Sequence, residues 1–257
     1  MNRTVTAALA ALAVAAPMAA LAPAAVADDM SGHKEMTFHA DLDPFKVNKV
    51  DGYGEATVHL KDRQVKVIIK ADGLLAGAPH AQHFHIAAKG VCPPDSAATK
   101  HNGKRALSTV DGQPFYGMIG ASLTTTGDTS PASALAVDRF PTGDTYTYER
   151  SFTVSEDTAA SLRAGTAVVV VHGIDYNGNG KYDNVLGPSQ LDPKLPLEAT
   201  APALCGTLNQ TPQGSVHGGL GGTQTGGVNT TAAGVGGALV LASGGAYVLR
   251  RRASRES

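Results

Sequence analysis

The stretch "GEATVHLKDRQVKVIIKA", residues 54–71, contains two segments in which apolar and polar side chains alternate. Residues 54–60 and 64–71 both follow this period of two and are enriched in β-branched residues, which is typical of strands with one buried face. The three residues between them, "KDR", have the length of a tight turn. The sequence therefore predicts an antiparallel hairpin.

Similar segments occur on both sides of this hairpin and predict about seven short strands in all. They are "MTFHADL" (36–42), "HAQHFHIA" (80–87), "TYTYERSFTV" (145–154), "TAVVVVH" (166–172) and "ALCGTL" (203–208). One helix is predicted after Ser155, which is a suitable N-cap, and it ends before Gly165. The fold class expected is all-β: an antiparallel Greek-key sandwich or barrel with one short helix.

The N-terminal segment has the pattern of an export signal. Residues 1–27 combine Arg3, a long alanine-rich apolar run and an Ala-Val-Ala exit, which predicts a secretory signal peptide. A retained membrane anchor is the alternative. Residues 28–210 then form the expected extracellular domain, which is long enough for a core of its own.

The C-terminal segment has the pattern of an attachment signal. Residues 211–230 are glycine-rich and predict a flexible linker, and residues 231–249 carry no charge and are long enough to cross a bilayer as a helix. Residues 250–257 contain four arginines, which places this tail in the cytoplasm and the domain outside. Cell-wall attachment is the alternative, since the tail resembles the sorting tails of wall-anchored bacterial proteins.

The amino-acid composition limits the classes of molecule that this chain is expected to bind. The chain has 21 Lys and Arg against 22 Asp and Glu, a net charge of -1 and no tryptophan. Without a basic patch, nucleic acid is not an expected partner, and no protein partner can be named.

Cys92 and Cys205 are the two cysteines, and in an exported protein such a pair predicts a disulfide. A reactive thiol and a metal thiolate are the alternatives.

The segment "HAQHFHI" holds three of the nine histidines. If it is a strand, Phe84 and Ile86 face the core while His83 and His85 lie side by side on the outer face. Neutral imidazoles in this arrangement suit copper or zinc. His80 just before the strand and His172 at the exit of a very apolar strand are further candidate ligands. The alternative is that the imidazoles are solvated or bond to loops that cover the sheet.

The order of these motifs resembles the copper/zinc superoxide dismutases. That resemblance implies copper ligation by His83, His85 and His172, and it places His101 where the family has its bridging histidine. It also pairs the two cysteines. The chain departs from the family because its other zinc histidines are missing and because Pro202 stands where the family has a guiding arginine. The resemblance therefore implies a copper-only site.

A second resemblance covers residues 37–208, and its individual motifs match this sequence more closely. "FHADL", "GYGEATVHL", "VKVIIKADGL", "HAQHFHI" and "LRAGTAVVVVH" follow the order of the CHRD domain, the family named from chordin. It implies a secreted β-domain with a paired-histidine strand and no established chemistry. The CHRD resemblance therefore describes the domain better, and the dismutase resemblance supplies the copper hypothesis.

The loop "GIDYNGNGKYDN" after His172 predicts a calcium-type site. Asp175, Asn177, Asn179 and Asp183 have the spacing of the oxygen ligands in an EF-hand loop, with a glycine at the sharp turn. Leu186 occupies the position of the bidentate glutamate. A polar Asn-Gly turn without a metal is the alternative.

Taken together, these patterns predict a surface-anchored β-domain that binds metal or contacts a partner without turnover, with no catalytic residue assigned. The second hypothesis is a copper-dependent superoxide dismutase that lacks the zinc site. The two differ in whether the copper site consumes superoxide.

Overall fold

The computed structural model describes residues 34–212, and every structural statement below concerns this part of the chain. The predicted signal peptide, the transmembrane helix, the basic tail and almost all of the linker lie outside the described residues. Within residues 34–212, no helix combines the length and the apolar character needed to cross a bilayer.

The described residues are mostly antiparallel β-structure with a few short helices, which confirms the all-β class. The strands are β1 (Met36–Pro44), β2 (Tyr53–Lys61), β3 (Gln64–Asp72), β4 (Gln82–Ile86), β5 (Thr99–His101), β6 (Lys104–Ala106), β7 (Met118–Ser122), β8 (Tyr146–Thr153), β9 (Val168–His172), β10 (Pro202–Thr207) and β11 (Asn209–Gln210). The α-helices are α1 (Thr109–Tyr116), α2 (Glu156–Arg163) and α3 (Leu197–Thr200), and short 3-10 turns occupy Lys46–Asn48, Asp95–Ala97, Pro131–Ser133, Val137–Arg139 and Asn184–Leu186.

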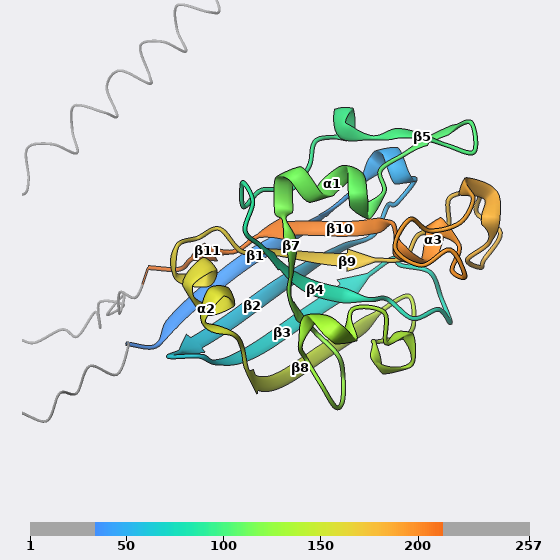
Figure 1. Cartoon of the computed structure of the whole chain (residues 1–257). Helices are drawn as coiled ribbons and strands as arrows, with labels where there is room; N and C mark the ends of the chain where they lie inside the picture. The colour runs from blue at the N-terminus through green and yellow to red at the C-terminus, as the bar shows by residue number, and fades with distance from the viewer. Residues whose placement is uncertain (1–33, 213–257) are drawn as a thin grey trace, which may run out of the picture. The chain divides into compact units, whose positions relative to one another are not determined.

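Nine strands form one curled sheet in the order β7-β4-β9-β10-β1-β2-β3-β8, with β11 added beside β1. Strand β1 joins the two halves of this sheet: most of its length pairs with β2, while its end pairs with β10 through Asp43 opposite Cys205. Figure 1 shows the long strands β1, β2, β3 and β8 side by side. In the other half, β7 is the edge strand next to β4, and α1 packs against β9 and β10. Strands β5 and β6 form a separate hairpin.

The predicted hairpin is confirmed as β2 and β3, with Leu60 opposite Val65 and Asp62 in the left-handed region of its turn. The alternating apolar residues of both strands enter the main core. Helix α2 is also confirmed: the Ser155 side chain accepts a hydrogen bond from the backbone N–H of Thr158. Helices α1 and α3 were not predicted.

Strand β9 is buried on both faces because helix α1 covers its outer side. Val169 and Val171 belong to the main core, while Val168 and Val170 pack in a second cluster with Tyr116 of α1. Helix α1 therefore covers this part of the sheet.

The predicted disulfide between Cys92 and Cys205 is confirmed, and it ties the chain after β4 to strand β10.

Candidate metal centre

The imidazoles of β4 lie on one face of the strand, as the period of two predicts. Phe84 and Ile86 pack in the main core, and His83 and His85 project to the opposite side. Across the β4–β9 ladder, His83 lies opposite Val170 and His85 opposite Val168. Since His172 follows Val170 by two residues on β9, it projects to the same side.

This side of the sheet is not open to solvent. His83, His85 and His172 retain at most 3% of their accessible surface, so the expectation of an open outer face is corrected to a covered one. The ring of Phe140 lies 5.4 Å from that of His83, and the ring of Tyr116 on helix α1 lies 4.4 Å from that of His85. The strand face that was predicted to be exposed is therefore buried within a second, smaller core.

The three histidines converge on one point. One ring nitrogen from each lies within 4.8 Å of those of the other two. Nδ1 of His83, Nε2 of His85 and Nε2 of His172 are buried and have no hydrogen-bond partner. Buried polar atoms are rarely left unpaired, because each one costs the free energy of its lost hydration. Three such atoms side by side form a suitable set of ligands for a metal ion.

The other nitrogen of each ring is held by a backbone carbonyl. Nε2 of His83 donates to the carbonyl of Ala134 at 3.0 Å, and Nδ1 of His85 donates to the carbonyl of Gly117 at 3.0 Å. Nδ1 of His172 donates to the carbonyl of Thr200 at 2.8 Å. A carbonyl only accepts, so each of these nitrogens carries the proton and the opposite nitrogen keeps its lone pair. Metal-binding histidines are oriented in the same way.

Burial also keeps these rings neutral. It lowers the pKa of His85 from 6.5 to about 4, and it lowers the pKa of His172 to about 3, with a further decrease from the neighbouring His85. The pKa of His83 falls for the same two reasons, burial first and then the nearby His172 and His85. At neutral pH all three imidazoles are therefore neutral, with one ring nitrogen free to bind a metal.

Two further predicted ligands lie elsewhere. His80 is buried, with its ring nitrogens 3.0 Å from the carbonyl of His172 and 3.1 Å from that of Leu75, so it contacts the backbone of the cluster rather than its centre. His101, at the end of strand β5, hydrogen-bonds to Asp111 instead, with 2.9 Å between its Nε2 and the carboxylate. Neither belongs to the group of histidines whose nitrogens converge.

The predicted calcium loop forms a compact turn around Asp175. Its carboxylate accepts hydrogen bonds from the backbone N–H groups of Gly178, Asn179 and Gly180. The side-chain amides of Asn177 and Asn179 both donate to Asp183. All four predicted side chains are thus brought into one turn.

Glu198 of helix α3 is a member of this loop that sequence reasoning missed. Its carboxylate accepts hydrogen bonds from the backbone N–H groups of Tyr176 and Asp183, and its side chain is fully buried. Burial raises the pKa of Glu198, and the nearby Asp183 carboxylate raises it further, while the two backbone donors oppose the rise. Leu186, at the position of the usual glutamate, is buried instead. No local sequence pattern connects Glu198 to the loop.

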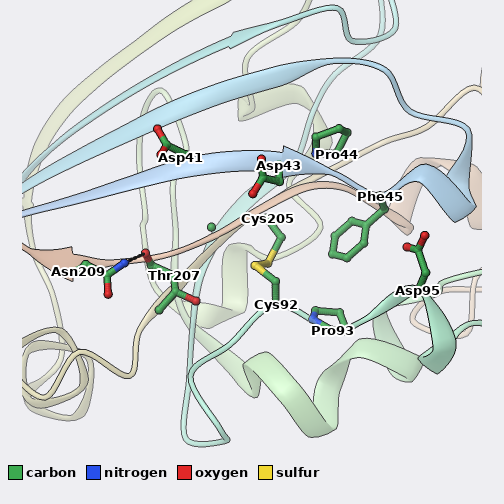
Figure 2. A pocket seen from close by; sticks show the side chains of 11 residues that line it. Asp41, Asp43, Pro44, Phe45, Cys92, Pro93, Asp95, Cys205, Thr207 and Asn209 are labelled. Carbon is green, nitrogen blue, oxygen red and sulfur yellow. Dashed lines mark hydrogen bonds between the residues drawn. A yellow bond between two sulfur atoms is a disulfide. The ribbon is translucent and has the colours of Figure 1, made fainter. Parts of the chain in front are cut away.

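A separate cavity of about 430 Å³ lies beside the disulfide, and no histidine lines it. Figure 2 shows Asp41, Asp43 and Asp95 around it, with Cys92 and Cys205 joined at its side. Within the described residues, none of the side chains that line it has a buried atom without a hydrogen-bond partner. The imidazole cluster is therefore the stronger candidate site.

No protein-family model matches this chain, and no curated protein matches it.

Proposed function

We propose that this chain is an exported, surface-anchored β-domain of the CHRD type, and that it binds one copper ion through His83, His85 and His172 without turnover. The observation that carries the proposal is the convergence of three buried, unpaired ring nitrogens within 4.8 Å. The attachment to the cell envelope rests on the terminal segments of the sequence.

Copper is preferred because the three ligands are neutral imidazoles. Among divalent first-row metals, sites of this kind bind copper more tightly than zinc. Neither a carboxylate nor a thiolate belongs to the group of convergent atoms in the described residues. A bound copper ion would supply a redox-active Lewis acid at this point. The protein's residues would orient the rings, through the carbonyls of Ala134, Gly117 and Thr200, and exclude bulk water.

Binding without turnover is preferred over superoxide dismutation because of the residue opposite His172. Pro202 pairs with His172 across the β9–β10 ladder, and the dismutase resemblance puts the guiding arginine at this position. A proline there supplies no positive charge to attract an anion. The copper-dependent dismutase remains the alternative, and it requires superoxide consumption at a rate that depends on all three histidines.

A weak calcium site around Asp175 is proposed as a structural accessory. Two observations support it: the loop gathers Asp175, Asn177, Asn179 and Asp183, and Glu198 adds a carboxylate next to Asp183. A hard cation would offset the repulsion between these carboxylates. The loop begins three residues after His172, so an ion there would also order the edge of the imidazole cluster.

The metal content of the full chain tests the main proposal. The protein is produced in an oxidising compartment, equilibrated with copper and zinc, and analysed for bound metal. We expect one copper per chain, and loss of at least 90% of it in His83→Gln, His85→Gln and His172→Gln. The control variant His39→Gln alters a half-buried histidine of β1 that lies outside the cluster and should keep its copper. Absence of copper from the wild type, or equal copper in all variants, would refute the assignment.

A further inference from the structure

Thr109, the first residue of helix α1, contacts the imidazole cluster through a shared carbonyl oxygen. Its hydroxyl donates a hydrogen bond of 2.5 Å to the carbonyl of Thr200. The same carbonyl accepts the hydrogen bond from Nδ1 of His172 at 2.8 Å, and the Thr109 oxygen lies 3.3 Å from that nitrogen. All three residues are buried. Polar groups from α1, α3 and β9 therefore meet at one carbonyl.

The positions of the protons in this contact follow from the carbonyl, which can only accept. Both Nδ1 of His172 and the Thr109 hydroxyl donate to it, so the hydroxyl turns a lone pair rather than its hydrogen toward Nδ1. The N–H of His172 thus faces two acceptor oxygens, as in a three-centre hydrogen bond. With the proton fixed on Nδ1, the buried Nε2 keeps the lone pair that a metal needs.

The Thr200 carbonyl can accept two side-chain donors because it lies at the end of a helix. Helix α3 spans Leu197–Thr200, and the last carbonyls of a helix have no partner within the helix. Thr200 is also held through its own hydroxyl, which bonds to Ser189 at 2.7 Å. The Thr109 hydroxyl therefore ties the covering helix α1 to the end of α3, at the carbonyl that orients His172.

The backbone around Thr109 is held by other contacts. The side chain of the buried Asn48 accepts from the N–H of Leu107 at 2.7 Å, and it donates to the carbonyls of Leu107 at 2.9 Å and Pro202 at 2.8 Å. The hydroxyl of Tyr116 donates to the carbonyl of Thr109 at 2.8 Å. Because none of these bonds uses the Thr109 side chain, loss of its hydroxyl should leave α1 in place.

We propose that Thr109 is a positioning residue of the metal centre: its hydroxyl fixes the Thr200 carbonyl and, through it, the proton on Nδ1 and the ring orientation of His172. The proposal rests on the proposed function and extends it to a residue outside the group of convergent ligands. Hydrogen-bond partners behind metal-binding histidines set the tautomer, the ring orientation and the metal affinity in this way. A threonine with a structural role alone would change only the free energy of unfolding.

The tautomer of His172 in the metal-free full chain is the first readout. Long-range proton–nitrogen NMR distinguishes a protonated from an unprotonated ring nitrogen, and His172→Gln identifies the signals of His172. We expect a protonated Nδ1 and an unprotonated Nε2 in the wild type. Thr109→Val keeps the shape of the side chain but removes the hydroxyl, so the Nδ1 signal should move and the other tautomer should appear. Thr109→Ser keeps the hydroxyl and should restore the wild-type signals.

Copper affinity is the second readout. We expect Thr109→Val to bind copper about tenfold more weakly than the wild type or worse, and Thr109→Ser to stay within about twofold of it, because loss of such a partner costs about 10–100-fold in metal affinity. Thr158→Val is the matched control: Thr158 is a buried threonine of α2 whose hydroxyl donates to the carbonyl of Gly120 at 3.1 Å. It should be less stable in urea, yet keep the His172 tautomer and the copper affinity.

The outcomes separate the two proposals. Failure of the wild type to bind copper refutes the proposed function, and the NMR comparison then decides by itself whether Thr109 fixes the tautomer of His172. Copper binding by the wild type together with unchanged His172 signals or unchanged copper affinity in Thr109→Val refutes the role of Thr109 alone. The same holds if Thr109→Ser fails to restore both readouts, or if Thr158→Val changes them as much as Thr109→Val does.

Discussion

The carbonyl oxygen of Gly117 lies 3.0 Å from Nδ1 of His85, and this hydrogen bond joins the end of helix α1 to the imidazole cluster. Gly117 can occupy this position because it has no side chain: its φ is +91°, and a Cβ there would lie 1.8 Å from the carbonyl oxygen of Ile86. The covering helix and the ligand geometry thus depend on one glycine.

Gly117→Ala should therefore damage both stability and metal binding. We expect the free energy of unfolding to fall by about 2 kcal/mol or more, because a strained φ adds to a steric overlap. Copper affinity should fall as well, since His85 loses its orientation. Gly77→Ala is the matched control: its φ is +71° and nothing lies within 4 Å of the added carbon. An equal loss in both variants would show that the overlap with Ile86 is unimportant.

Low pH should destabilise the metal-free protein. His85 and His172 have pKa values of about 4 and about 3 in the folded state, against 6.5 as their ordinary value. Between these limits the unfolded chain binds protons that the folded chain does not, so stability falls as the pH decreases from 6.5. Each ring contributes up to about 1.4 kcal/mol per pH unit.

Urea unfolding of the metal-free protein at several pH values measures this slope. His85→Gln removes one of the buried titrating groups and should make the slope shallower. A profile that is flat between pH 6.5 and 4.5, or one that His85→Gln leaves unchanged, would contradict the assignment of buried neutral imidazoles.

The sequence predicted those features that depend on local periodicity. Strand alternation accounts for the β2–β3 hairpin and for the location of His83 and His85 on the face of β4 that does not carry Phe84. The apolar pattern of β9 likewise predicts His172 at the exit of that strand. Such patterns are local, so they can be recognised before any tertiary contact is known.

The covering of the site was harder to predict because it depends on tertiary packing. Helix α1 contains Gly112 and Pro114, which disfavour a helix, and its one local signal is the capping box of Ser108 and Asp111. Asp111 also takes His101 as its partner, and this removes that histidine from the cluster. Only the folded chain shows that α1 turns an exposed strand face into an interior.

Calcium should stabilise the loop after β9. We expect millimolar calcium to raise the thermal midpoint of the wild type by several degrees, because an ion that binds only the folded state adds to its stability. Asp175→Asn and Glu198→Gln should each abolish most of this increase. Asp192→Asn, in the following loop, is the control. Calorimetry with and without a chelator checks the result, and no calcium-dependent shift in the wild type would leave a metal-free polar turn.

The disulfide should contribute strongly to stability. Cys92 and Cys205 are 113 residues apart, and closure of a loop of this length is worth about 4–5 kcal/mol on the chain-entropy model. The double variant Cys92→Ser/Cys205→Ser should lose much of this in urea unfolding. Because Cys205 packs in the same cluster as Tyr116 and Val170, copper affinity should fall too. A loss below about 1 kcal/mol would contradict the chain-entropy account of this cross-link.

The X-ray absorption spectrum of the full chain loaded with one equivalent of copper tests the central claim most directly. The account predicts three imidazole nitrogens as protein ligands, with no sulfur, and loss of this signature in the His83→Gln/His85→Gln/His172→Gln variant. A spectrum dominated by carboxylate oxygen or by sulfur, or one that the triple variant leaves unchanged, would contradict the account.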